Sequence, residues 1–147
     1  MQLQDIIRNK GTSVVTIPSI ATVADLVTLM ADEQIGAVVV SADGRHVEGI
    51  VSERDVVRGL AAEGADLLES TVADLMTAPV HTCNPGDSVE DTARTMTDRR
   101  IRHVPLVDAD ELQGIVSIGD VVKLRIDQLT DERDYLIDYV QDPSARR

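Results

Sequence analysis

One ten-residue segment occurs twice in this chain, and that repetition limits its fold more than any other feature. GIVSERDVVR runs from Gly49 to Arg58, and GIVSIGDVVK runs from Gly114 to Lys123, with seven of the ten positions identical. A repeat at a fixed spacing, here 65 positions in a chain of 147 residues, defines the structural unit. Two copies are too few for a solenoid, so we expect two related units packed about a pseudo-two-fold axis.

The similarity between the copies extends upstream of these segments. Six residues of the first copy recur 66 positions later in the second: Val23, Asp25, Met30, Asp32, Ile35 and Val38 become Val89, Asp91, Met96, Asp98, Ile101 and Val104. The spacing falls from 66 to 65 in the stretch between Val40 and Gly49, where the second copy is one residue shorter. A deletion of this kind is tolerated at a loop tip, which predicts a hairpin there.

Each copy is predicted to form strand, helix, strand, strand, helix, from its apolar periodicity and its turn residues. In the first copy we expect strands at 14–17, 37–40 and 47–51, with helices starting after Thr22 and Ser52. In the second we expect strands at 80–83, 103–107 and 112–116, with helices starting after Ser88 and Ser117. The fold class is therefore α/β (α+β), with two βαββα repeats.

The domain ranges follow from this pattern. We place the first repeat with its N-terminal helix at 1–63, a linker at 64–71, the second repeat at 72–125, a C-terminal helix extension at 126–142 and a tail at 143–147. The last helix is predicted to run from 117 to about 141, because Pro143 prevents its continuation. Its apolar residues have heptad spacing with Arg133 in the seam, which favours contact with a second subunit; the alternative is a helix lying on its own domain.

Composition excludes several classes of protein. No run of 18 apolar residues is present, so we expect no membrane span, and the N-terminus lacks the features of a signal peptide. The net charge of −12 disfavours nucleic acid as a partner. The single cysteine, Cys83, cannot form an internal disulfide, which fits a reducing compartment, and we expect a cytoplasmic location.

The repeated element places Ser-x-x-Asp between a strand and a helix, as Ser52 to Asp55 and as Ser117 to Asp120. Unpaired N–H groups and the positive dipole end at a helix N-terminus suit an anionic ligand. A carboxylate three residues further on can accept both hydroxyls of a ribose, as acidic residues do in dinucleotide sites. The alternative interpretation is that Ser-x-x-Asp is only a capping box.

The chain resembles a tandem pair of cystathionine-β-synthase-type (CBS) domains, also called a Bateman module. The segments that carry the resemblance are GIVSERDVV, GIVSIGDVV, IGAVVV at 35–40 and IRHVPLVD at 101–108. It implies a regulatory module that binds AMP, ADP, ATP, S-adenosylmethionine or NAD(H) in two clefts between the repeats. The Ser-x-x-Asp of one repeat would then face the first strand and the hairpin of the other.

The resemblance also implies two sets of ligand-binding residues. One cleft would use Thr16, Ile17, Gly36, Ala37, Val38, Ser117 and Asp120. The other would use Ser52, Arg54, Asp55, Thr82, Cys83, His103, Val104 and Pro105. Four cationic residues are expected near phosphates: Arg54, Arg100, Arg102 and Lys123. Because Glu53-Arg54 follows one serine and Ile118-Gly119 the other, the two clefts should not be equivalent.

Residues 99–103 form a cationic cluster with two interpretations. Arg99 and Arg100 either pair with Asp98 or solvate a helix end, whereas Arg102 and His103 lead into a strand of the cleft and are expected to meet the ligand. His81 and Cys83 share one strand face, but two ligands do not make a zinc site, so we expect no metal.

Three function classes follow. The first is a non-catalytic adenosine-ligand sensor that forms a homodimer and signals to an effector protein, because no nucleophile set or phosphate loop is present. The second is a structural or interaction module with vestigial clefts. The third is an enzyme or redox sensor that acts through Cys83.

Overall fold

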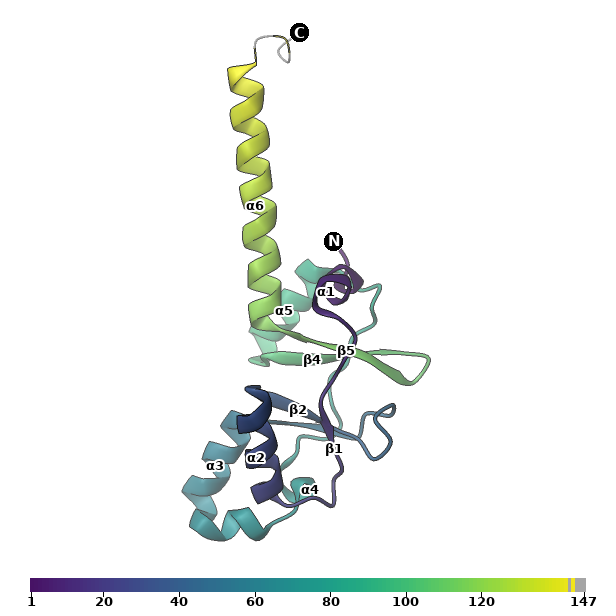
Figure 1. The fold of residues 1–147 in the computed structure, drawn as a ribbon, viewed down its shortest axis with the longest axis vertical. Coiled ribbons are helices and arrows are strands. Elements are labelled where there is room, and N and C mark those ends of the chain that lie inside the picture. Colours follow the sequence, from purple (N-terminus) through teal and green to yellow (C-terminus); the bar gives the residue numbers. More distant parts are fainter. Residues whose placement is uncertain (143, 145–147) are drawn as a thin grey trace.

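The computed structural model describes residues 1–142 and 144, and its elements form two related halves (Figure 1). The first half contains α1 (Leu3–Lys10), β1 (Thr16–Ile17), α2 (Val23–Glu33), β2 (Ala37–Val40), β3 (Gly49–Ser52) and α3 (Glu53–Glu63). A 3₁₀ helix, η1 (Gly64–Glu69), leads to α4 (Val72–Leu75), α5 (Val89–Arg99), β4 (His103–Asp108), β5 (Glu111–Ser117) and α6 (Ile118–Gln141). This arrangement confirms the α/β class and the long last helix. The predicted tail at 143–147 lies, apart from Ser144, outside the described residues.

The two halves build unequal sheets. In the first, β1 pairs parallel with β2 and β2 pairs antiparallel with β3; in the second, the named strands are the antiparallel pair β4 and β5. The prediction of a strand at 80–83 was wrong, because only Cys83 forms a bridge there, parallel to Leu106. Thr16 pairs with Val39 in the first half, and the position equivalent to Val39 in the second is Pro105. Proline has no N–H to donate, which shortens this ladder.

The helices start at the residues that the sequence predicts. The hydroxyl of Thr22 accepts a hydrogen bond from the Asp25 N–H at 3.1 Å, and the hydroxyl of Ser117 accepts one from the Asp120 N–H at 3.1 Å. Capping of this kind satisfies N–H groups that have no partner within the helix. The segment predicted as a linker is not extended, because η1 buries Leu67 against the first half.

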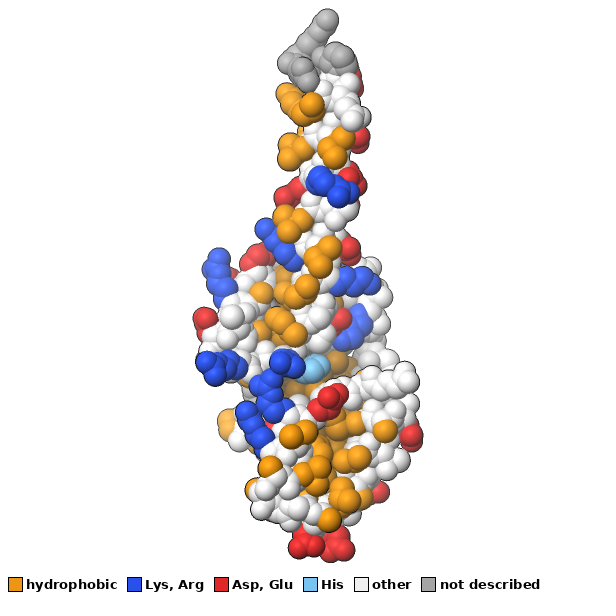
Figure 2. Space-filling view, turned by 90° about the vertical axis from the view of Figure 1, so that its left-hand side faces the viewer, with side chains coloured by type: hydrophobic (Ala, Val, Ile, Leu, Met, Phe, Trp, Pro, Cys, Tyr) orange, Lys and Arg blue, Asp and Glu red, His pale blue; other side chains and the backbone are white. Residues whose placement is uncertain are grey.

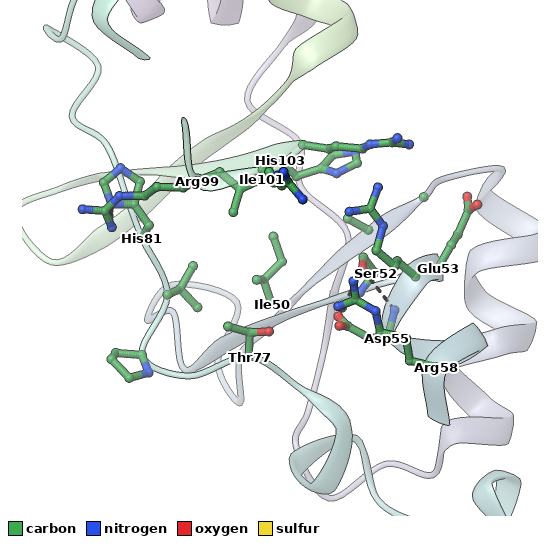
Figure 3. Close-up of a pocket in the computed structure, with 17 residues that line it drawn as sticks. Ile50, Ser52, Glu53, Asp55, Arg58, Thr77, His81, Arg99, Ile101 and His103 are labelled. Carbon is green, nitrogen blue, oxygen red and sulfur yellow. Dashed lines mark hydrogen bonds between the residues drawn. The ribbon is translucent and has the colours of Figure 1, made fainter. Parts of the chain in front are cut away.

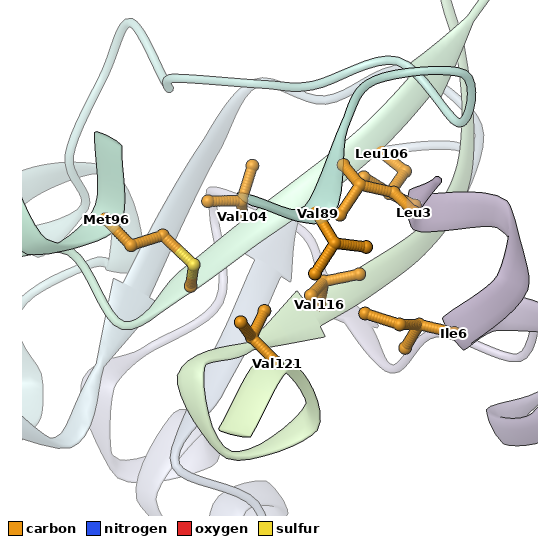
Figure 4. Close-up of a cluster of buried hydrophobic side chains, with 8 residues drawn as sticks. All are labelled: Leu3, Ile6, Val89, Met96, Val104, Leu106, Val116 and Val121. Carbon is orange, nitrogen blue, oxygen red and sulfur yellow. The ribbon is translucent and has the colours of Figure 1, made fainter. Parts of the chain in front are cut away.

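Each half has its own apolar core, and each core includes a helix from the other half's part of the sequence. Leu3 and Ile6 of α1 are buried in the second core (Figure 4), and Val72 of α4 is buried in the first. The full second core consists of Leu3, Ile6, Val89, Met96, Val104, Leu106, Val116 and Val121. The predicted domain ranges describe the sequence, but in space α1 and α4 are exchanged between the repeats.

The exchange explains the glycine at the start of each repeated segment. A Cβ at Gly114 would lie 2.5 Å from Cδ1 of Ile7 in α1, and a Cβ at Gly49 would lie 2.6 Å from Sδ of Met76 after α4. Real Cβ atoms do not approach other atoms so closely, so a side chain at Gly114 or Gly49 would force the side chain of Ile7 or Met76 to move.

Helix α6 extends far beyond the body of the molecule (Figure 1). Its extension carries exposed apolar side chains, among them Leu136 with 59% of its surface exposed. Within the described part of the chain, no helix is long and apolar enough to cross a membrane.

Candidate ligand-binding cleft

A cavity of about 710 Å³ lies between the two halves (Figure 3). One wall comes from the first half, through Gly36, Ala37, Ile50, Ser52, Glu53, Arg54, Asp55 and Arg58. The rest of the lining comes from the later part of the chain, through Thr77, which pairs with Ile50 of β3, and through Pro79, Val80, His81, Arg99, Arg100, Ile101, Arg102 and His103. Its volume is in the range of cavities that bind small molecules and cofactors.

Ser52 and Asp55 hold each other at the start of α3. The Ser52 N–H and hydroxyl donate to Oδ2 of Asp55 at 2.9 and 3.1 Å, and this pair lines the cavity. Oδ1 of Asp55 accepts no hydrogen bond from a described residue. The two interpretations of Ser-x-x-Asp are therefore compatible, because Asp55 closes the capping box through Oδ2 and also lines a ligand-sized cavity.

Gly36 keeps this part of the cleft open. Its carbonyl accepts a hydrogen bond from the Glu53 N–H at 3.0 Å, which ties the start of β2 to the start of α3. A Cβ at Gly36 would lie 2.8 Å from Oε1 of Glu53 and 3.9 Å from Cε1 of His103. A larger residue here would require the Glu53 carboxylate to move.

His103 stands between the cleft and the second Ser-x-x-Asp. Burial lowers the pKa of His103 below its ordinary value, and the positive charge of Lys10 lowers it further, against the opposing effect of Asp120 and Glu53. The imidazole is therefore neutral near pH 7, with one nitrogen that donates and one that accepts.

The cationic residues of 99–103 line the cleft. Arg99 Nη1 lies 3.5 Å from Nδ1 of His81, and Arg100 ends α5 in the left-handed conformation with φ of 55°. Among the described residues, neither arginine forms an ion pair with Asp98, but both lie at the end of α5, as the alternative of a solvated helix end expects.

The second Ser-x-x-Asp is engaged by a lysine from α1. Oδ2 of Asp120 accepts from the Ser117 N–H at 2.9 Å and from Lys10 Nζ at 2.7 Å, while Lys10 also donates to the Ile115 carbonyl at 3.1 Å. Burial by itself raises the pKa of Asp120, but the hydrogen bonds from Lys10 and Ser117 outweigh it and hold that pKa below its usual value. Asp120 therefore has a cationic partner, whereas Asp55 has none within ion-pair distance among the described residues.

The predicted site residues do not all meet in one place. Gly36 and Ala37, expected beside Ser117, line the cleft of Ser52 instead. Ile17 and Val38 lie in the first core and Val104 in the second, while Cys83 packs against the second core, where burial raises the pKa of its thiol. Thr16, Thr82, Pro105 and Lys123 are not among the residues that line this cavity. Ligand contacts by these residues stay a prediction.

Sequence reasoning missed several residues of the cleft, chiefly Glu53, Arg58 and His81. Arg58 was detectable, because it lies four residues after Arg54 and therefore on the same face of α3. His81 was not, because the segment before Cys83 has no regular structure whose periodicity would orient it.

Comparison with known proteins gives one consistent result. The model of the CBS domain family matches residues 4–62 and 72–127. The crystal structure of the CBS-domain containing protein ATU1752 from Agrobacterium tumefaciens is 39% identical with a TM-score of 0.81, over 85% of this chain and 99% of that one. The mitochondrial CBS domain-containing protein CBSX3 of Arabidopsis thaliana is 33% identical over 95% of this chain and 71% of its own length.

Ligands are present in more than one of the similar structures. The CBS domain protein PAE2072 from Pyrobaculum aerophilum, which was solved in complex with AMP, is 28% identical with a TM-score of 0.72. The match covers 82% of this chain and 89% of that one.

Proposed function

This chain belongs to the CBS domain family, with two repeats in one polypeptide, and on that premise we propose that it is a non-catalytic regulatory module that binds an adenosine-containing ligand. The observation that carries the proposal is the Ser52–Asp55 pair at the edge of a ligand-sized cavity between the repeats. The AMP complex of PAE2072 supports adenosine as the recognised group. In this proposal Asp55 accepts the ribose hydroxyls, and Ile50, Val80 and Ile101 provide an apolar surface for adenine.

We place the main site in the cleft of Asp55 rather than at Asp120. Lys10 already donates to the Asp120 carboxylate, so a ribose there would have to compete with an ion pair whose distance is 2.7 Å. Asp55 has no cationic partner within ion-pair distance among the described residues. We therefore expect each chain to bind one adenosine-containing ligand.

In this proposal the ligand regulates the protein by binding between the two repeats. The walls of the cleft come from different repeats, so a ligand that contacts both stabilises one angle between them over others. The exposed apolar residues of α6 form the surface for a homodimer, through which this change reaches an effector protein. A cytoplasmic location stays a prediction.

Calorimetric titration of AMP, ADP, ATP, NAD(H) and S-adenosylmethionine tests the proposal. We expect one site per chain, and we expect Asp55→Asn to weaken binding by at least about tenfold, since it removes a charged hydrogen-bond acceptor. Asp120→Asn is the matched control, because it makes the same change at the equivalent position of the other repeat. Circular dichroism melting of both variants verifies that each is folded.

Two results would overturn this assignment. Loss of binding in Asp120→Asn with retention in Asp55→Asn would move the site to the other cleft. No heat from any of the ligands at millimolar concentration, with protein shown to be ligand-free, would leave an interaction module. The exposed apolar face of α6 favours that second function specifically.

A further inference from the structure

The cleft concentrates positive charge in a strongly negative protein. The chain has 14 Lys and Arg residues against 26 Asp and Glu, for a net charge of −12. Five of its arginines nevertheless line this one cavity: Arg54, Arg58, Arg99, Arg100 and Arg102. Figure 2 shows Lys and Arg side chains gathered around a histidine at the waist of the molecule, between the two halves. A concentration of like charge facing a cavity indicates an anionic ligand.

Within the described chain, carboxylates do not fix the guanidinium groups of these arginines in ion pairs. No ion pair joins any of them to an acidic side chain among the residues that the structure describes, although other arginines pair with nearby acids. Arg94, on the same helix as Arg99, pairs with Asp91 at 3.6 Å. Unpaired guanidinium groups that face one another across a cavity repel, and that repulsion is relieved when an anion lies between them.

The arginines come from both walls. Arg54 and Arg58 lie one turn apart on α3, next to Asp55, whereas Arg99, Arg100 and Arg102 belong to the end of α5 and the start of β4. In Figure 3 Arg58 lies beside Asp55, and Arg99 lies beside His81 on the opposite wall. Guanidinium groups bind phosphate oxygens through two parallel N–H donors, which lysine cannot do.

We propose that the cleft selects a nucleoside polyphosphate, with phosphates that bridge the arginines of the two repeats. The inference rests on the proposed function and gives its ligand class: ATP or ADP in preference to AMP, and S-adenosylmethionine least. A single phosphate meets only part of the arginine set, whereas a triphosphate has enough oxygens to reach both walls. S-adenosylmethionine carries a sulfonium and an ammonium group, which the arginines repel.

The same geometry connects binding with the angle between the repeats. Arginines lie on both walls, and an anion that binds only one wall does not link the two. A polyphosphate that binds arginines of both walls draws the walls together. The effect grows with the number of phosphates, so a ratio of ATP to AMP is read as a change in shape.

Calorimetry in magnesium-free buffer at low and high salt tests the inference, with AMP, ADP, ATP, S-adenosylmethionine and inorganic tripolyphosphate as ligands. We expect roughly tenfold tighter binding for ATP than for AMP, because charged hydrogen bonds to phosphate are each worth at least one such factor. The preference should shrink as salt rises, since ions screen the charges.

Substitutions of single arginines test which side chains cause the preference for ATP over AMP. Arg54→Gln and Arg102→Gln, one from each wall, should reduce ATP affinity several-fold more than AMP affinity. Arg94→Gln is the matched control, because it removes the same charge from an exposed position outside the cleft, and it should leave the ATP to AMP ratio unchanged.

The outcomes separate this inference from the proposed function. Equal affinity for AMP and ATP in wild type, or an ATP to AMP ratio unaffected by Arg54→Gln and Arg102→Gln, would overturn the polyphosphate inference and leave the adenosine module standing. Binding of tripolyphosphate with the same affinity as ATP, and unaffected by Asp55→Asn, would support the phosphate site and overturn adenosine recognition. Absence of all binding would overturn both.

Discussion

At the scale of single residues, small differences between the repeats give the two copies of Ser-x-x-Asp different neighbours. Both copies cap a helix in the same way, with the aspartate accepting from the serine N–H at 2.9 Å. Arg54 lines the cleft beside Asp55, whereas Gly119 stands at the equivalent position beside Asp120. Lys10 then neutralises Asp120 from another helix. The two copies thus have the same local structure but different neighbours.

The half-buried imidazole of His103 predicts a pH dependence of stability. Its pKa in the folded state is lowered, so between that pKa and the ordinary value of 6.5 the unfolded chain binds more protons. The contribution of His103 to the free energy of unfolding should therefore be complete above about pH 6.5. It should be lost as the pH is lowered from about 6.5 to the pKa of the folded state. Thermal melts from pH 7.5 to 5 measure this slope.

His103→Gln removes the titrating group while keeping a polar side chain, and its melting midpoint should change less over the same range. Lys10, Asp120, Glu53 and Arg102 are the charged groups that influence this ring, and they remain in the variant. An NMR titration of the His103 ring measures the pKa directly. A value above 6.5, or identical slopes for wild type and His103→Gln, would contradict the prediction.

At the scale of elements, the exchange of α1 and α4 joins the two repeats. Each exchanged segment packs on a glycine of the other repeat, through Ile7 on Gly114 and Met76 on Gly49. Backbone hydrogen bonds extend the contact, since the Leu3 N–H donates to the Asp87 carbonyl at 3.0 Å. Neither repeat has a complete core without the segment that precedes the other, so we expect the two to unfold together.

Truncation of α1 should destabilise a distant part of the sequence. Leu3 is fully buried in the second core, so Leu3→Ala should lower the free energy of unfolding by about 2–5 kcal/mol, the usual cost for a leucine in a packed core. Urea denaturation measures the change, and Leu68→Ala, at a position with 38% exposure, is the control that should cost much less. Amide exchange in Leu3→Ala should rise first in β5, which α1 contacts. Faster exchange confined to residues 14–40 would instead place α1 on the first repeat.

At the scale of the whole molecule, one face combines the cleft with an exposed apolar stripe on α6. Figure 2 shows apolar side chains along α6 and again over the lower half, on either side of the cationic waist. On α6 they form a shallow groove lined by Leu129, Glu132, Arg133, Leu136, Ile137, Val140 and Gln141. An isolated helix gains little from such a stripe unless a second surface covers it. A homodimer that covers this face would place two clefts next to its interface.

Introduction of charge into the apolar groove of α6 tests the dimer. The double variant Leu129→Lys and Leu136→Lys should convert a dimer into a monomer, because it would place unpaired charges in the apolar interface. Sedimentation equilibrium measures the mass. The control is Thr130→Lys, an exposed position of α6 outside the groove, which should remain dimeric.

Monomeric wild-type protein at micromolar concentration, or an unchanged dimer in the double variant, would refute this role for α6. Nucleotide titration of the double variant adds a second readout. Because the cleft is built within one chain, its affinity should change far less than its oligomeric state.

The sequence by itself determined the family, the two-fold repetition and the helix starts, because these depend on local patterns: apolar periodicity, capping residues and an internal match. It also identified Ser52, Asp55, Arg54, Arg102 and His103, which line the cleft in the structure. Only the tertiary structure decided the contacts between distant segments. The exchange of α1 and α4, the Lys10–Asp120 pair and the convergence of five arginines each join residues far apart in the chain. Local sequence patterns cannot predict these contacts. Side-chain periodicity indicates which face of its own helix or strand a residue occupies, but not which distant segment packs against that face.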